Sequence, residues 1–466
     1  MRHLIGQFLV LLVAAAAPWV PAYGAPLTPY HLDTPGQLEA ERRAIRIFHR
    51  PEIQSARAKI AQMFVAEQEA TTESGRQTLD SAVEEHAFAG LFFSVNNDPS
   101  RPAVLWAENA PHAWHGLSVP GSRFGQDNPD NIYRIIFIDN AHEYVLHGEP
   151  QGGVPAQVSF ELLDSAPGTM NNMGHQIAIL QSTNMKFDPD GGFTITIGPK
   201  AASGNHFQTV PEARAIWIRD TLSDWNAQAP YRLTISVTGG PKTSPASDEQ
   251  LARRAASDMT SFARYWLDFY PRYLANAWEG AVNIPPQPTA RPGDASKGGG
   301  ARWGYTSGAT VDLKRDEAIV FTVDDMSAKF LGCVFANPWW ITTDYAHRSG
   351  SVNNGQARRN ADGTTTYVIA AEDPGVANWI DTSGLSRGEI LLRWQGLQGA
   401  LPPSNTMTTE GFLVRNEQAV SLKTVRDGRV VPLSQVRTLY PALTESPSQR
   451  AKALATRLAG YERRLR

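Results

Sequence analysis

The sequence is poor in several features that mark particular protein classes. Its 466 residues include one cysteine, Cys333, which excludes an internal disulfide framework and a thiolate metal cluster. Positive and negative charges nearly balance, because the chain has 43 Lys and Arg and 46 Asp and Glu, which give a net charge of -3. A general nucleic-acid-binding protein needs a basic face, so this balance argues against one.

Long apolar runs are also missing. A helix that crosses a bilayer needs ~20 apolar residues, and no stretch of the sequence reaches that length. We therefore expect no integral membrane segment. What is present is a hydrophobic content of 42%, enough for a sizeable core, together with 38 Gly, 32 Pro and 12 Trp, which is typical of a turn-rich β protein. At ~100–200 residues per domain, the length suggests two or three domains.

The amino terminus has the pattern of a secretory signal peptide. Arg2 and His3 precede an apolar run from Leu4 to Ala17, and small residues at Ala22 and Gly24 suit a cleavage site. We predict that residues 1–24 are removed and that the mature chain, starting at or near Ala25, is periplasmic or secreted. Cys333 lies in an apolar run, and we interpret it as a small buried side chain.

Hydrophobic periodicity divides the rest of the chain. Apolar side chains at helical spacing predict a helical segment over 25–95, which begins after a capping pattern at Thr34 and Gln37 and is interrupted at Pro51. Short strands separated by turn residues then predict a first β domain over 96–240. Within it, the strand 132–138, the turn at Asp139 and Asn140, and the strand 142–147 predict a β-hairpin.

A second capping pattern, Ser247 with Gln250, opens a long amphipathic connecting helix over 246–282. A Pro- and Gly-rich linker over 283–304 follows, then a second β domain over 305–440, which includes a strand predicted over 419–425, and a basic helix over 446–466. The predicted fold class is α+β and mostly β. It has a helical N-terminal segment and two antiparallel β-sandwich or jelly-roll-like domains joined by the long helix.

Few short motifs lie in the secondary structure that their chemistry requires. Gly384–Gly388 matches G-x-S-x-G, but a nucleophile elbow needs a strand before it and a helix after it, whereas here a strand follows. We interpret this segment as a turn. The spacing of His112 and His115 would suit a metal pair only on a helix, and Pro111 and Gly116 favour a loop. The sequence therefore predicts no metal site and no cofactor.

Two groups of polar and aromatic residues are candidate sites. The run Asn128–Tyr133 leads into the predicted hairpin, where Asn and Asp usually cap a turn but can also line a binding site at the mouth of a sheet. The second group lies between Asn337 and Trp394 and combines acids, arginines, a histidine and four tryptophans. Such a mixture suits either a ligand pocket or a sandwich core with ion pairs at its rim.

This second group carries a family resemblance. Asp324-Asp325, Asn337-Pro338, Asp344-Tyr345, Asn360–Thr364, Asp373-Pro374-Gly375, Asn378-Trp379 and Leu392-Arg393-Trp394 follow one another in an order similar to the bacterial domain-of-unknown-function family number 1214. The resemblance covers about residues 318–396. Asp344 before Tyr345, and the residues after Asn378, depart from the family pattern. The resemblance implies a β-rich, jelly-roll-like C-terminal domain, often found in exported proteins, and it implies no established reaction.

The functional prediction is an exported binding protein for a hydrophobic or saccharide-like small molecule. A hydrolase or lyase acting on such a ligand and a structural assembly scaffold are the alternatives. An enzyme would draw an acid–base pair from Asp344, His347, Asp373 and Asp381. The predicted ligand-binding residues are Asn128, Asp130, Tyr133, Trp339, Trp340, Tyr345, Arg348, Asn378, Trp379 and Arg393.

Overall fold

Three helices form the N-terminal part of the described chain. In this computed structural model the described residues are 29–291, 304–397, 406–407, 413–414 and 424–465. Thr34 caps the first helix by accepting a hydrogen bond from the Gln37 backbone, but the Gln37 side chain bonds Glu41 and Trp106 instead of completing the capping box. The helical elements are α1 (Pro35–Phe48), α2 (Pro51–Ala66), η1 (Gln68–Thr71) and α3 (Glu73–Asn96).

The first β-sandwich follows these helices. Its sheets have the strand orders β1-β4-β10-β6-β7 and β11-β5-β8-β9, and a separate small ribbon pairs β2 with β3. The strands are β1 (Leu105–Ala107), β2 (His112–Trp114), β3 (Leu117–Val119), β4 (Asn131–Phe137), β5 (Glu143–Glu149), β6 (Gln157–Leu163), β7 (Gln176–Gln181), β8 (Phe193–Gly198), β9 (His206–Gln208), β10 (Ala215–Thr221) and β11 (Arg232–Gly239).

The predicted hairpin of 132–138 with 142–147 is wrong. Strand β4 pairs with β1 and β10 in one sheet, while β5 pairs with β8 and β11 in the other. Asp139 turns the chain from one sheet to the other by accepting hydrogen bonds from the backbones of Ala141 and His142. Both strands have an apolar face for the same core, and burying those faces against each other is what separates them into opposite sheets.

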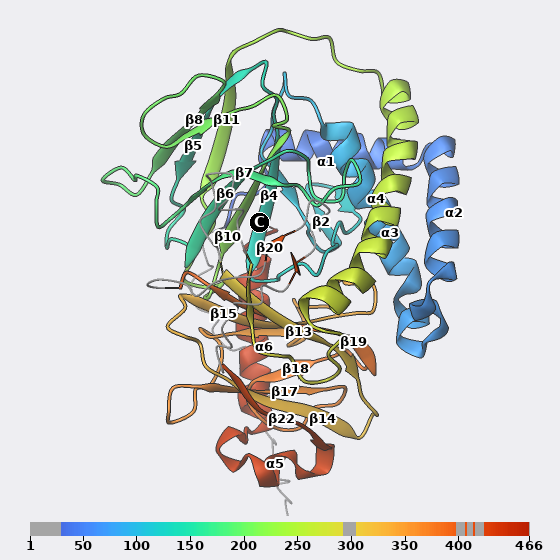
Figure 1. Ribbon diagram of the computed structural model, residues 1–466, viewed down its shortest axis with the longest axis vertical. Coiled ribbons are helices and arrows are strands. Elements are labelled where there is room, and N and C mark those ends of the chain that lie inside the picture. Colours follow the sequence, from blue (N-terminus) through green and yellow to red (C-terminus); the bar gives the residue numbers. More distant parts are fainter. Residues whose placement is uncertain (1–28, 292–303, 398–405, 408–412, 415–423, 466) are drawn as a thin grey trace, which may run out of the picture.

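Helix α4 (Asp248–Ala277) connects the two halves of the molecule (Figure 1). It begins with the predicted capping box of Ser247 and Gln250. It packs against α3 so closely that a Cβ atom on Gly90 would lie 2.8 Å from the Cα atom of Met259. The two backbones can therefore meet only because position 90 has no side chain.

The second β-sandwich is built as two further sheets. Their strand orders are β12-β13-β19-β15-β16 and β18-β17-β14-β22, and a separate ribbon pairs β20 with β21. The strands are β12 (Thr289–Arg291), β13 (Gly304–Asp312), β14 (Glu317–Val323), β15 (Phe330–Ala336), β16 (Ser351–Asn353), β17 (Thr365–Ala370), β18 (Trp379–Asp381), β19 (Arg387–Gln395), β20 (Thr406–Met407), β21 (Leu413–Val414) and β22 (Val425–Pro432). The predicted fold class, mostly β with a helical N-terminal segment and antiparallel sheets, is confirmed.

Short helical turns and a last helix complete the chain: η3 (Leu433–Gln435), α5 (Val436–Leu439), η4 (Pro441–Leu443) and α6 (Pro447–Glu462). Helix α6 joins the two sandwiches. Its Arg457 bonds Ser351 of the second sandwich, and the guanidinium groups of Arg457 and Arg464 lie 4.3 and 4.4 Å from the ring centroid of Trp225, which follows β10 in the first. Two guanidinium groups thus contact the ring of Trp225.

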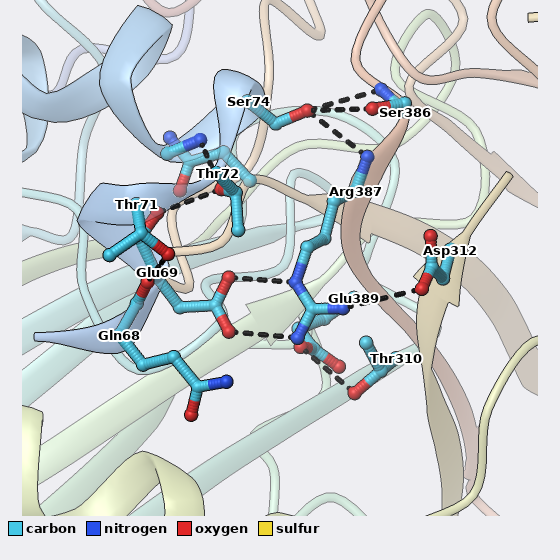
Figure 2. Close-up of polar contacts among 12 residues, drawn as sticks. Gln68, Glu69, Thr71, Thr72, Ser74, Thr310, Asp312, Ser386, Arg387 and Glu389 are labelled. Carbon is cyan, nitrogen blue, oxygen red and sulfur yellow. Dashed lines mark hydrogen bonds and ion pairs between the residues drawn. The ribbon is translucent and has the colours of Figure 1, made fainter. Parts of the chain in front are cut away.

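The helical segment also docks directly on the second sandwich (Figure 2). Glu69 receives hydrogen bonds of 2.8 and 2.9 Å from the guanidinium of Arg387 on β19. The Ser74 hydroxyl accepts hydrogen bonds from the backbones of Ser386 and Arg387, both of 3.1 Å. Ser386, the serine of the G-x-S-x-G pattern, therefore takes part in a packing contact with α3. Beside these contacts Glu389 is buried, and it accepts a hydrogen bond from Thr310.

Some predictions fall outside the described residues. The signal peptide over 1–24 does so entirely, as does most of the strand predicted over 419–425. The linker over 283–304 does so in part, although its residues Thr289–Arg291 form β12 and pair with β13. Among the helices that the structure describes, none has the length and apolar character needed to cross a membrane.

Candidate functional site

A pocket of about 770 Å³ opens where the helical segment, the second sandwich and α6 meet. Most of its wall comes from three parts of the chain: α3, the segment between β15 and β16, and the C-terminal residues 458–465 in and after α6. Their principal contributions are Gln77, Thr78 and Ser81; Thr343, Asp344, Tyr345, His347 and Arg348; and Leu458, Tyr461 and Leu465. Hydroxyl, carboxylate and apolar groups therefore share one concave surface.

Asp344 and His347 form an exposed pair on this wall. The Asp344 carboxylate caps the turn by accepting a 3.2 Å hydrogen bond from the His347 backbone, and His347 Nδ1 lies 2.9 and 3.0 Å from its two oxygens. The side chains are 51% and 63% exposed. The carboxylate orients the imidazole, and Nε2 is left to interact with a ligand or to move a proton.

Arg348 is fixed by Asp381 behind the pocket wall. Its guanidinium lies 3.0 and 2.9 Å from the two carboxylate oxygens of Asp381. Asp381 is buried and also accepts a hydrogen bond of 2.8 Å from the backbone of Ser383. Because both oxygens are engaged, Asp381 serves to hold Arg348 and does not reach the pocket as an acid or a base.

The deeper part of the pocket is aromatic and electrically balanced. The rings of Tyr345 and Tyr461 meet edge to face with their centroids 5.6 Å apart. Burial raises the pKa of the Tyr345 hydroxyl far above its ordinary value, so this group stays protonated. Arg123, which also lines the pocket, is paired with the buried Glu85 at 2.8 Å and donates to the Thr342 carbonyl.

Four other predicted residues meet elsewhere, between the two sandwiches. Asn128, Asp130 and Tyr133 belong to the loop before β4 and to β4 itself, and Arg393 comes from β19. The Arg393 guanidinium donates to the backbone carbonyl of Gln126 in that loop. Burial raises the pKa of Tyr133, whose hydroxyl accepts hydrogen bonds from the Asn128 backbone and from the Asn131 amide.

The remaining predicted residues have structural positions. Trp340 stacks between Tyr270 and Trp278, with ring centroids 4.7 and 5.8 Å away, and Trp339 donates to the Gly75 carbonyl of α3. Both tryptophans are buried in the core below the helices. They join the helical segment to the second sandwich and do not line the pocket.

Asp373, Asn378 and Trp379 lie on another part of the second sandwich. Asp373 caps a turn and pairs with Arg450 at 2.8 Å. The Asn378 amide bonds the backbones of Arg358 and Thr366, and Trp379 donates to the Ala370 carbonyl. The sequence suggested one pocket containing Trp379, Asp381 and Arg393. In the structure these residues lie apart: Asp381 holds Arg348 behind the pocket wall, Trp379 bonds Ala370, and Arg393 lies between the two sandwiches.

Several residues that line the pocket carry no sequence signal. Gln77, Thr78 and Ser81 read as the polar side of a helix, and Tyr461 as part of a basic terminal helix. They reach the pocket only because α3 and α6 pack against the segment 337–348.

Two histidines with metal-like spacing, His112 and His115, do not face each other, since His112 is buried against Trp106 and Trp114. The described residues contain no group of three or more potential metal ligands.

Comparison with known proteins gives the fold and no function. No family model matches the chain, and neither does any curated protein. The resemblance to family number 1214 thus stays a prediction. The crystal structure of an uncharacterized protein from Burkholderia cenocepacia superimposes with a TM-score of 0.64 at 23% identity, covering 84% of this chain and 99% of that one. A Vibrio parahaemolyticus protein matches with a TM-score of 0.37 at 12% identity, covering 59% of this chain and 86% of that one.

Proposed function

We propose that the protein is an exported binding protein whose pocket between α3, α6 and the segment 337–348 takes a saccharide-like small molecule. One observation carries the proposal: Asp344, Tyr345, His347 and Arg348, predicted as site residues from the sequence, lie on one wall of a pocket of about 770 Å³. Pockets that bind small molecules measure roughly 300–1,000 Å³, which suits a ligand of one or two sugar rings.

The charges of the lining favour a neutral ligand. Arg123 is paired with Glu85 and Arg348 with Asp381, so neither arginine offers a free positive charge to an anion. The hydroxyl groups of Thr78 and Ser81, together with the Asp344 carboxylate, can exchange hydrogen bonds with sugar hydroxyls. The apolar surface of Leu458 and Leu465 can cover the face of a sugar ring.

Two variants test the binding proposal by calorimetric titration with a panel of neutral disaccharides: maltose, cellobiose and lactose. Leu458→Trp should abolish binding because the indole projects into the pocket and occupies the place of a sugar ring. Asp344→Asn keeps the shape and removes one charged hydrogen bond of about 1–3 kcal/mol, so the dissociation constant should rise by about 5- to 150-fold.

A matched control is available in His115→Gln. His115 and Asp33 form a similar exposed pair, 2.8 Å apart, that does not line the pocket. This control should bind as the wild type does. Binding that survives Leu458→Trp would place the ligand elsewhere and refute the proposal.

A hydrolase is the second candidate, favoured by the imidazole of His347 held at Nδ1 by Asp344. Under it, the Asp344–His347 pair is the acid–base pair, and Asp344→Asn or His347→Gln would abolish release of reducing sugar while leaving binding measurable. Release of no product by the wild type, with binding intact, would leave the binding function alone.

A further inference from the structure

Residues 240–247 connect β11 of the first sandwich to α4 and run across the top of the molecule in Figure 1. Every residue of this connector is exposed. Hydrogen bonds rather than buried apolar side chains therefore hold it in place. Two of these bonds reach Thr243: its hydroxyl lies 2.7 Å from the Ser100 hydroxyl, and its carbonyl accepts a 2.6 Å hydrogen bond from the Arg101 guanidinium.

A third bond to the connector comes from His142, at the turn between β4 and β5. The His142 side chain is 4% exposed and lies between two oxygen atoms. Nδ1 is 2.7 Å from Asp139 Oδ1, and Nε2 is 2.8 Å from the backbone carbonyl oxygen of Pro241 in the connector. The turn keeps the ring in this position, because Asp139 also accepts hydrogen bonds from the backbones of Ala141 and His142.

The two partners of the ring determine its protonation state. A carbonyl oxygen only accepts hydrogen bonds, and so does an ionised carboxylate. Both nitrogens of His142 must therefore donate, which requires the imidazolium form, since a neutral ring carries a proton on one nitrogen alone. A neutral ring would turn the lone pair of its other nitrogen toward an oxygen at 2.7 or 2.8 Å.

The surroundings also favour the positive ring. Burial by itself lowers the pKa of His142, but the hydrogen bonds to Asp139 and the Pro241 carbonyl, with the nearby negative charges, raise it above the ordinary value of 6.5. Burial raises the pKa of the Tyr144 hydroxyl, whose ring centroid is 5.9 Å away, so that group stays neutral. Further charged groups on the neighbouring elements are Asp98, Arg101, Glu143 and Lys242, and of these Asp98 and Arg101 form a pair.

Loss of the proton from His142 breaks one of its two contacts. The hydrogen bond to the Asp139 carboxylate is stronger than a bond to a neutral carbonyl, so Nδ1 keeps the remaining proton. Nε2 then faces the Pro241 carbonyl with a lone pair, and this contact becomes repulsive. Because the pKa is higher in the folded protein, the bond to the connector is fully present below pH 6.5 and is lost as the pH rises through the folded-state value.

We propose that His142 is a pH-sensitive switch, which binds the connector 240–247 to the β4–β5 turn as an imidazolium and releases it as a neutral imidazole. The released part includes Lys242, whereas Ser100 and Arg101 still hold Thr243. His142 and the connector do not line the pocket at α6, so the switch and the proposed binding function can fail independently. Since we propose that the chain is exported, the pH that acts on the switch is that outside the cytoplasm.

The first test is the titration of the His142 ring, followed by NMR of the whole mature chain with 15N-labelled histidine from pH 5 to 9. His142→Phe identifies the signals of this ring. We expect the ring to carry protons on both nitrogens at pH 6.5 and to titrate with a midpoint above that value. Asp139→Asn leaves an oxygen beside Nδ1 but removes the negative charge, so it should shift the midpoint to lower pH.

The second test is the rate at which trypsin cuts after Lys242, divided at each pH by its rate on a small chromogenic substrate. In the wild type this ratio should rise by about tenfold or more between pH 6 and 9, as expected for the loss of one hydrogen bond from a charged group. His142→Phe should be cut fast throughout. The matched control is His147→Gln, because His147 is an exposed histidine of β5 that bonds Thr194 and not the connector. It should keep the wild-type profile.

A His142 midpoint at or below 6.5 would show that the ring is neutral at pH 7 and would overturn the proposal. A normalised cleavage rate that does not change with pH, or that is the same in His142→Phe and the wild type at pH 6, would overturn it as well. If His142→Phe does not fold, Asp139→Asn decides, because its cleavage rate must then rise at a lower pH than that of the wild type.

Discussion

Replacing Trp225 by alanine is expected to lower the free energy of unfolding by about 3–5 kcal/mol. The residue is 2% exposed, its ring contacts the guanidinium groups of Arg457 and Arg464, and its indole donates a 2.8 Å hydrogen bond to the buried Asp130. The change removes the packing of a large aromatic ring, two cation–π contacts and one partner of a buried carboxylate. Urea unfolding followed by circular dichroism measures the loss.

Two further variants separate these contributions. Trp225→Phe keeps an aromatic face for the two arginines but cannot donate to Asp130, so we expect an intermediate loss. Trp379→Ala is the matched control, because this tryptophan is only partly buried and makes one hydrogen bond, to the Ala370 carbonyl. If Trp225→Ala cost no more than the control, α6 would not be the element that joins the two sandwiches.

Glu389→Gln is expected to make the protein more stable at pH 8.5 while changing little at pH 4. Burial, with the negative charge of Glu69 nearby, raises the pKa of Glu389 from an ordinary value of 4.5 to about 8 (Figure 2). Between these two values the folded protein retains a proton that the unfolded chain has released. Stability therefore falls as the pH rises from 4.5 to 8, by up to about 1.4 kcal/mol per pH unit, and is constant above 8.

Glutamine resembles the protonated acid in shape and cannot ionise, so the variant should lose this slope. The measurement is the free energy of unfolding at half-unit steps from pH 4 to 9. Glu372→Gln is the control: this acid is half exposed and pairs with Arg315 on the surface, and its removal should leave the slope in place. A Glu389→Gln profile parallel to the wild type would show that folding does not raise the pKa of Glu389.

Much of the fold follows from local sequence patterns. Thr34 and Ser247 mark helix starts because their side chains bond the backbone three residues later, a contact that needs no distant partner. Short strand-like segments separated by turn residues likewise predicted the two β regions. Which strands pair with each other was harder to predict from the sequence. A tight turn after β4 favours a hairpin, but the shared core places β4 and β5 in opposite sheets.

The candidate sites depended far more on tertiary structure. The sequence brought Asp344, Tyr345, His347 and Arg348 together because they are neighbours along the chain. It offered no way to place α6 against them, nor to separate Trp379 and Arg393 from them. The same holds for the polar residues that meet between the two sandwiches, where Asn353 bonds Asp130 across 223 positions of the chain.

The physical reason is the range of the interactions. Caps, turns and periodic faces are decided within a few residues, so the sequence by itself determined the helices, most strands and the mostly β fold class. Which polar groups lie together depends on how whole elements pack, through contacts such as that of Gly90 with Met259 and that of Trp225 with two arginines. Only the tertiary structure decided those contacts, and with them the pocket at α6 and the polar residues that meet between the sandwiches.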